Sequence, residues 1–341
     1  MSGLLKLAGI VVALLMLAAG GVWYQYQSFL DTPLDLSSSD EVLLVKKGSS
    51  VSSVLTTLEN RAITRLDWKW RLLNRLHPVT IKAGEYALPS GMFPAGLLDL
   101  LASGEVITYR FTIVEGWSVQ QLIDNLKLDP VLTHTIERAD ELAGLEGMPV
   151  GHPEGWFLPE TYVFTRGDKD VDILRRAYEA MQLSLNRAWE GRDAELPYES
   201  AYDLLTMASI VEKETSLPSE RADIAGVFVR RLQQNWRLET DPTIIYGIGE
   251  TFDGDIKRDD LKTDNPYNTY TRFGLPPSPI SLPGDAALQA AAHPADGEAM
   301  FFVASGKGGH NFSVTLQEHN KAVQRYLKYR ASQNSTQPDT P

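Results

Sequence analysis

Cysteine is absent from this sequence of 341 residues. Its absence excludes a disulfide framework and thiolate metal sites, and it fits an oxidising compartment in which stray thiols are a liability. The six histidines are scattered and never show the His-Glu-x-x-His spacing of a zinc site. The segment Gly306-Lys-Gly-Gly lacks the spacing of a phosphate-binding loop. We therefore expect neither a metal nor a cofactor.

Basic residues are scarce relative to acidic ones. The chain has 32 Lys and Arg against 44 Asp and Glu, a net charge of −12. Because nucleic-acid binding normally requires a basic surface, this balance argues against a nucleic-acid partner. The hydrophobic fraction of 43% and the charged fraction of 22% are ordinary for a folded protein. The length is sufficient for two domains or more.

The N-terminus carries an uncharged apolar run from Leu7 to Trp23. Together with the leucines just before it, this run is long enough to span a bilayer. Lys6 lies on one side, and Trp23, Tyr24 and Tyr26 lie on the other, where interfacial aromatic residues are common. The pattern predicts a membrane anchor over residues 7–26, with residues 1–6 in the cytoplasm and the rest exported. A cleaved signal peptide is the alternative, because residues 18–21 are small.

Composition and periodicity divide the exported part, which we expect to have an α+β fold. The predicted segments are a linker (27–40), a small α+β module (41–105), a mixed α+β domain (106–331) and a disordered polar tail (332–341). A pattern of strand, glycine turn, serine cap and amphipathic helix occurs at 45–58 and again at 113–126, with a weaker copy at 91–101. The copies indicate either related subdomains or a pattern common in α+β proteins.

A basic helix is predicted between the first two copies, from Arg65 to Leu76. It carries Trp68 and Trp70, which lie on different faces of a helix, so one of them should be exposed. The exposed ring could stack on a sugar or lie at a membrane surface. The simpler interpretation is a half-buried helix in a small domain.

In the larger domain, the periodicity predicts an alternation of helices and strands. We expect helices at 171–189, 201–215, 219–232, 286–293 and 316–330, and strands at 106–114 and 301–304. Residues 238–280 are rich in polar and turn residues and predict a long irregular segment. Long irregular segments inside compact domains are usually functional.

Two acidic residues, Glu212 and Glu214, end the apolar helix predicted at 201–215. A helix C-terminus disfavours an anion and burial raises a carboxyl pKa, which together suit a general acid. Glu214 continues the apolar face of Met207 and Val211, whereas Glu212 points elsewhere. The alternative is that both are solvated charges at a helix end.

A conventional glycosidase needs two carboxylates at a set separation. Asp241, Asp264 and Glu160 are available as a second acid, but no pattern singles one out. The later polar segments combine amides, hydroxyls and aromatic rings, which suit a saccharide. The predicted substrate-binding residues are Thr240, Asp241, Tyr267, Asn268, Tyr270, His310 and Phe312. His310 also has a simpler interpretation as a turn residue beside two glycines.

Several motifs resemble those of the MltG (YceG-like) family of endolytic murein transglycosylases. They are Ala-Ser-Ile-Val-Glu-Lys-Glu-Thr at 208–215, Thr-Asp-Pro-Thr at 240–243, Tyr-Asn-Thr-Tyr at 267–270, Gly-Leu-Pro-Pro at 274–277, Ala-Ala-His-Pro at 291–294 and Lys-Gly-Gly-His at 307–310. The resemblance covers nearly the whole chain, including the N-terminal run. We see no departure from the motifs that would indicate an inactive member.

The resemblance implies a single-pass inner-membrane protein of Gram-negative type, with most of the chain in the periplasm. It implies that residues 41–105 form a LysM-like glycan-binding module and that residues 106–331 form the catalytic domain, with its catalytic glutamate on a helix. The family cuts peptidoglycan strands between N-acetylmuramic acid and N-acetylglucosamine and leaves a 1,6-anhydromuramyl end. The implied partners are nascent glycan strands and peptidoglycan synthases (penicillin-binding proteins), with termination of strand elongation as the role.

The resemblance also bears on the choice between the two glutamates. In the related soluble lytic transglycosylases a hydroxyl residue follows the catalytic glutamate, and Glu214-Thr215 matches that pattern while Glu212-Lys213 does not. Glu214 is therefore the predicted catalytic residue. Two other functions stay open: a membrane-anchored peptidoglycan hydrolase that uses water, and a glycan-binding scaffold without activity.

Overall fold

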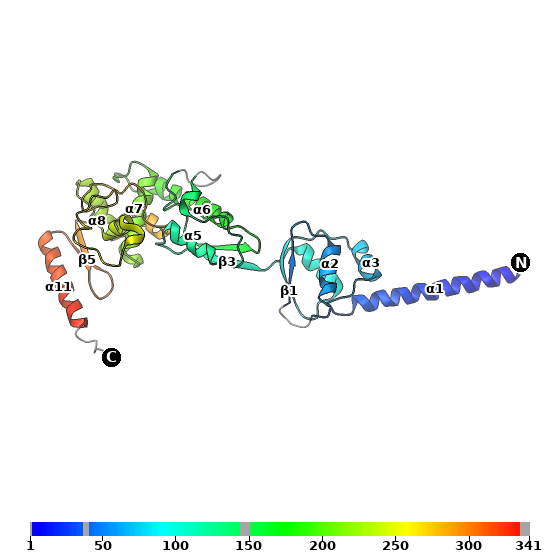
Figure 1. Cartoon of the computed structure of the whole chain (residues 1–341). Helices are drawn as coiled ribbons and strands as arrows, with labels where there is room; N and C mark the ends of the chain where they lie inside the picture. The colour runs from blue at the N-terminus through cyan, green and yellow to red at the C-terminus, as the bar shows by residue number, and fades with distance from the viewer. Residues whose placement is uncertain (1, 37–40, 144–150, 335–341) are drawn as a thin grey trace, which may run out of the picture. The chain divides into compact units, whose positions relative to one another are not determined.

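A computed structural model of the chain describes residues 2–36, 41–143 and 151–334 (Figure 1). The chain divides into two compact units. Unit 1 comprises Met1–Tyr109 with Val163–Asp168, and unit 2 comprises Arg110–Tyr162 with Lys169–Pro341. The boundary falls within β3 (Thr108–Thr112) and β4 (Thr161–Thr165), which pair as a two-stranded sheet. The predicted mixture of helices and strands is confirmed.

Unit 1 begins with one long helix, α1 (Ser2–Leu30), whose apolar stretch is long enough to cross a membrane. Its side chains are exposed from Gly3 to Gln25, but Tyr26 is buried in the core of the unit. Leu34 joins the same core just after the helix. The chain immediately after the apolar stretch is thus packed into unit 1. Part of the predicted linker, residues 37–40, lies outside the described residues.

The rest of unit 1 is a small α+β fold. Its elements are β1 (Glu41–Val45), α2 (Val51–Asn60), α3 (Trp68–Leu76), β2 (Gly84–Leu88) and α4 (Pro94–Ser103). β1 and β2 pair antiparallel, with Leu43 opposite Tyr86. Trp70 and Leu73, on the inner face of α3, pack into the core, while Trp68 remains exposed. The prediction of one buried and one exposed tryptophan on this helix is confirmed.

The two strong copies of the repeated pattern have the predicted local structure. Ser50 and Ser118 each form a capping box at the start of α2 and α5 (Val119–Lys127). Gly48 and Gly116 have φ angles of 82° and 78°. These left-handed conformations explain the glycine in each turn, because side chains with a Cβ rarely adopt them.

Unit 2 is built around α7 (Ala201–Glu214), which packs against α6 (Asp170–Gly191), α8 (Arg221–Gln233) and α10 (Asp285–Ala292). Every α7 residue from Leu204 to Val211 is buried. The remaining elements are η1 (Ala139–Leu142), η2 (Pro218–Glu220), α9 (Asp241–Ile248), η3 (Gly249–Thr251), β5 (Phe301–Ala304), β6 (His310–Ser313) and α11 (Leu316–Asn334). Because α7 is packed on several sides, the position of its C-terminal end is fixed.

Two predictions about regular structure were wrong in detail. Within the segment 238–280 that we expected to be irregular, residues 241–248 form α9. This helix has proline in its first turn, where the missing N–H costs nothing. It has only eight residues, contains Gly247 and is followed by Gly249, which weakens any periodic signal. The final helix α11 continues to Asn334, so residues 332–334 of the predicted tail are helical. Residues 335–341 of that tail lie outside the described residues.

Candidate active site

Glu214 is the last residue of α7, and its carboxylate accepts a hydrogen bond from the Thr240 hydroxyl at the start of α9. The side chain is largely buried but keeps part of its surface accessible. Burial, with a smaller contribution from the nearby Asp241 charge, raises the pKa of Glu214 to about 7, although Thr240, His310 and Arg231 oppose the rise. At neutral pH such a group exists in comparable amounts as acid and as base. Glu214 is therefore not a solvated helix-end charge.

Glu212, two residues earlier, has a different environment. One carboxylate oxygen lies 3.0 Å from Arg221, and the other accepts a hydrogen bond of 3.0 Å from the backbone N–H of Gly284. Arg221 also lies 3.1 Å from Glu115. Glu212 thus joins α7 to α8 and to the start of α10. It is held in an ion pair with Arg221, which the sequence did not predict.

His310, at the start of β6, is held by Glu220 at the end of η2. The ring Nδ1 lies 2.8 Å from one Glu220 oxygen, and the backbone N–H of His310 donates to the other at 2.8 Å. Thr215 also hydrogen-bonds to Glu220 through its side chain. Burial alone would raise the pKa of Glu220, but these hydrogen bonds outweigh it and lower the pKa. The sequence analysis missed Glu220, for which the motifs gave no signal.

Phe312 lies beside this histidine on β6, with ring centres 6.5 Å apart. Phe302 on β5 meets the His310 ring edge-on at 5.4 Å. The imidazole is therefore fixed by a carboxylate on one side and aromatic rings on the other. The charge of His310 lowers the pKa of Glu214. The structure thus brings the predicted residues Glu214 and His310 together.

Tyr270 and Asp241 form a second pair near Glu214. The Tyr270 hydroxyl donates to Asp241 at 2.7 Å. Burial and the hydrogen bond to Asp241 raise the Tyr270 pKa, and the charge of Glu214 contributes to that rise. The tyrosine hydroxyl stays neutral and able to donate. Of the three acids considered as a second catalytic carboxylate, Asp241 is the one whose charge is felt by Glu214.

The other two acids lie elsewhere. Asp264 is exposed and paired with Arg272 at 2.8 Å, and the exposed Glu160 is tied into the β3–β4 region, where its backbone carbonyl accepts from Ile113. Asn268 is 1% exposed. Its amide donates to the carbonyls of Asp260 and Thr263, and its oxygen accepts from the N–H of Tyr270. The structure therefore favours a positioning role for Asn268 over the predicted direct contact with substrate.

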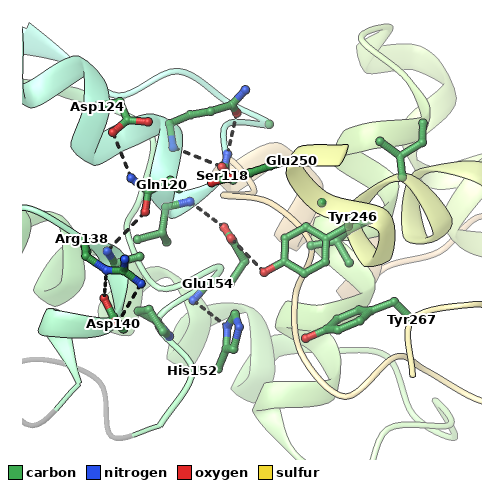
Figure 2. A pocket seen from close by; sticks show the side chains of 18 of the residues that line it. Ser118, Gln120, Asp124, Arg138, Asp140, His152, Glu154, Tyr246, Glu250 and Tyr267 are labelled. Atoms are coloured by element: carbon green, nitrogen blue, oxygen red, sulfur yellow. Dashed lines mark hydrogen bonds and ion pairs between the residues drawn. The ribbon is translucent and has the colours of Figure 1, made fainter. Parts of the chain in front are cut away.

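A cavity of about 1080 Å³ lies in unit 2 between α5, α9 and the segment 151–154 (Figure 2). Tyr267 lines it, meets Tyr246 edge-on at 4.9 Å and hydrogen-bonds to Ser278 at 2.7 Å. Lys213, adjacent to Glu214 in the chain, also lines the cavity. The cavity therefore reaches the C-terminal end of α7. This cavity was not predicted from the sequence.

Glu154 is a second buried acid, and it lines this cavity. Its carboxylate accepts from the N–H of Val119 at 3.0 Å and from the Tyr246 hydroxyl at 3.1 Å, as Figure 2 shows. Burial raises the Glu154 pKa to about 7. Glu154 was not predicted from the sequence, because an isolated acid in a Gly- and Pro-rich segment carries no periodic signal.

A profile of the YceG-like family matches residues 43–325. The chain belongs to the YceG-like family. The match includes Glu214 and every predicted binding residue, and it begins after α1. The matched region therefore contains the whole of α7, including Glu214 at its end.

Relatives of this YceG-like chain carry one name. A Bacillus subtilis protein named endolytic murein transglycosylase is 30% identical over an alignment of 335 positions, which covers 91% of this chain and 91% of that protein. A Streptococcus pneumoniae protein of the same name is 26% identical, and the match covers 93% of this chain but 64% of the streptococcal one. A solved structure of a putative yceG-like protein from Listeria monocytogenes matches 83% of this chain and 98% of its own, with a TM-score of 0.56 and 29% identity.

Proposed function

We propose that this chain is an endolytic murein transglycosylase that cuts peptidoglycan strands with Glu214 as its acid and base. The observation that carries the proposal is the desolvated Glu214 at the end of α7, with a pKa of about 7. A lytic cleavage uses a hydroxyl of the sugar itself as nucleophile, so one carboxyl group can serve both proton transfers. The shared name of relatives that match more than nine-tenths of this chain supports the same activity.

In the first step the protonated Glu214 donates its proton to the oxygen between N-acetylmuramic acid and N-acetylglucosamine. The C1–O bond breaks, and positive charge develops at C1 of the muramyl ring. The new carboxylate would stabilise that charge. In the second step it takes the proton of the muramyl 6-hydroxyl as O6 bonds to C1. The products are a 1,6-anhydromuramyl end and a free 4-hydroxyl, and no water is consumed.

The neighbours of Glu214 would assist in different ways. The Thr240 hydroxyl fixes the rotamer of Glu214, and the Tyr270 hydroxyl, held by Asp241, can hydrogen-bond to a sugar hydroxyl. His310 and Phe312 present an imidazole and an aromatic face on β6. Tyr267 belongs to the cavity between α5 and α9, where neighbouring parts of the strand can lie. Thr240, Asp241 and Asn268 act as positioning residues in this scheme.

The remaining parts of the chain fit a membrane-proximal enzyme. α1 would be an uncleaved anchor with Lys6 on the cytoplasmic side and both units in the periplasm. Residues 41–105 would bind glycan as a LysM-like module. Peptidoglycan synthases would supply the nascent strands at the membrane, so cleavage there would end strand elongation.

The test is Glu214→Gln, assayed with purified protein on uncrosslinked glycan strands and read by mass spectrometry. Wild type should give 1,6-anhydromuramyl ends, and the variant should lose at least about two orders of magnitude in rate because the amide cannot transfer the proton. Glu160→Gln, an exposed acid of unit 2, is the matched control and should cleave normally. Near-normal cleavage by Glu214→Gln would refute the assignment.

The same assay separates the two competing functions. A hydrolase would give reducing ends heavier by one water, and Asp241→Asn would then abolish the product as fully as Glu214→Gln. A scaffold without activity would give no cleavage with wild-type protein. Either result would contradict the proposed lytic reaction.

A further inference from the structure

Helix α1 is joined to unit 1 by packing as well as by the chain. Tyr26 is 4% exposed, and Phe29 meets the buried Trp70 of α3 edge-on at 5.2 Å. Immediately after the helix, the N–H of Leu34 donates to Met92 at 2.8 Å and that of Asp35 donates to Ile63 at 2.9 Å. A flexible tether would show none of these contacts. The end of α1 is therefore a structural part of unit 1.

The position of these contacts along α1 sets the height of α3 above a membrane. Trp23 and Tyr24 are exposed at the end of the apolar stretch, where aromatic side chains mark the interface. Phe29 is six residues further on, about 9 Å along the helix axis. Each headgroup layer is roughly 5–8 Å thick. Lys69 of α3 lies 5.4 Å from the Phe29 ring, so α3 would lie at the outer edge of the headgroups.

The outward face of α3 has the chemistry of a membrane-surface helix. Trp70 and Leu73 point into the core. Trp68, Arg71 and Arg75 are spaced three and four residues apart, so they share the opposite, exposed face. In Figure 1, α3 lies on the side of unit 1 from which α1 leaves.

The charge of this segment differs from that of the whole chain. Residues 61–76 contain five basic residues and one acidic residue, within a protein of net charge −12. Two of the five have acidic partners: Arg61 lies 3.6 Å from Glu41, and Lys69 lies 3.1 Å from Asp67. Arg65, Arg71 and Arg75 are exposed. A local basic surface beside an apolar anchor is complementary to anionic lipid headgroups.

We propose that α3 docks unit 1 on the outer surface of the membrane that holds α1. Arg71 and Arg75 bind the phosphates of anionic phospholipids, and the Trp68 ring enters the headgroup boundary. The proposal rests on α1 being an uncleaved anchor, as proposed above, but it does not depend on Glu214 or on the cleavage reaction. Docking would hold unit 1 flat against the membrane surface.

The absence of cysteine makes the test direct, because a single introduced cysteine can be labelled without background. Full-length protein with Trp68→Cys is labelled with a polarity-sensitive aromatic fluorophore and placed in nanodiscs that contain phosphatidylglycerol or only phosphatidylcholine. We expect quenching by aqueous iodide to fall about threefold in the anionic discs, because the label moves into the headgroup boundary. A label at Ser52→Cys, exposed on α2, should be quenched equally in both.

Charge variants test the role of the arginines. Arg71→Glu/Arg75→Glu should abolish the protection of the Trp68→Cys label by phosphatidylglycerol. Lys46→Glu/Lys47→Glu, an equal charge change in the turn between β1 and α2, should leave the protection unchanged. Equal quenching in the two kinds of disc, or equal loss with the lysine variant, would overturn the proposal. Protection by murein strands in detergent, without lipid, would overturn it in favour of a glycan site.

Two further measurements distinguish a failure of docking from a failure of the membrane anchor or of the cleavage reaction. A chain that fails to co-elute with nanodiscs has no anchor, and docking falls with it. Glu214→Gln should keep the lipid-dependent protection while losing cleavage. If that variant loses protection as well, the two properties are coupled in a way that contradicts the proposal.

Discussion

Glu220 receives hydrogen bonds from both the ring and the backbone N–H of His310, each at 2.8 Å. This bidentate contact fixes the imidazole of His310, which lies on β6, through a residue of η2. Gly309 leaves room for it, because a Cβ at that position would come within 2.2 Å of the Glu220 carboxylate. The orientation of His310, whose charge affects the pKa of Glu214, therefore depends on Glu220.

The first prediction concerns Glu220→Gln. The variant keeps one acceptor oxygen but loses the charge that holds the ring, so the influence of His310 on Glu214 weakens. Because the His310 charge lowers the Glu214 pKa, that pKa should rise, and the pH–rate profile should move to higher pH with a roughly tenfold lower kcat. Glu220→Asp should partly restore the profile. A lower kcat with an unmoved profile would mean that Glu220 has only a structural role.

The second prediction concerns stability and the Glu214 carboxyl. Its folded pKa of about 7 lies above the ordinary glutamate value of 4.5, so the folded state binds the proton more tightly than the unfolded state. The free energy of unfolding should therefore decrease as pH rises from about 4.5 through 7. Glu214→Gln removes this loss. The free energy of unfolding of the variant minus that of wild type should therefore be on the order of 1–3 kcal/mol larger at pH 8 than at pH 5. Thermal unfolding at the two pH values measures it, and equal differences would contradict the raised pKa.

A third prediction concerns the Thr240 hydroxyl, which donates to Glu214. Thr240→Val keeps the shape of a fully buried side chain but removes the donor. The Glu214 carboxylate loses a stabilising hydrogen bond, so its pKa should rise and its rotamer should loosen, with a roughly tenfold loss of kcat at neutral pH. Thr240→Ser should stay close to wild type. Steady-state kinetics on glycan strands measure both, and equal activity of the Val and Ser variants would show that the hydroxyl is dispensable.

The fourth prediction separates Glu212 from Glu214. Glu212→Gln leaves Arg221 with the more exposed Glu115 as its carboxylate partner, which should cost about 1–3 kcal/mol of stability. The anhydro product should be unchanged, since Glu212 does not transfer a proton in the proposed reaction. Denaturant unfolding and product mass spectrometry together measure this. Loss of product in a variant of normal stability would identify Glu212 as the catalytic acid.

The sequence predicted the position of the elements around Glu214 better than the contacts between them. The apolar period of residues 201–211 located α7, and the helical phase distinguished Glu214 from Glu212, because both properties are local. Glu220, Arg221 and Glu154 were missed, since their roles arise from residues brought together across long stretches of chain. Asn268 was selected by residue type, but burial shows that its amide holds a turn. Short helix α9 was missed because eight residues provide too little periodicity.

The Arg221 ion pairs also have a consequence for folding. Glu115 and Arg221 are separated by 106 positions in the sequence, and Gly284 and Glu212 by 72. Contacts of such separation form late, because the chain must first close large loops. The geometry at the end of α7 should therefore be completed only when most of unit 2 has folded. We expect a chain that is still folding to be unable to cut glycan, a delay that would protect the cell wall from unfinished enzyme.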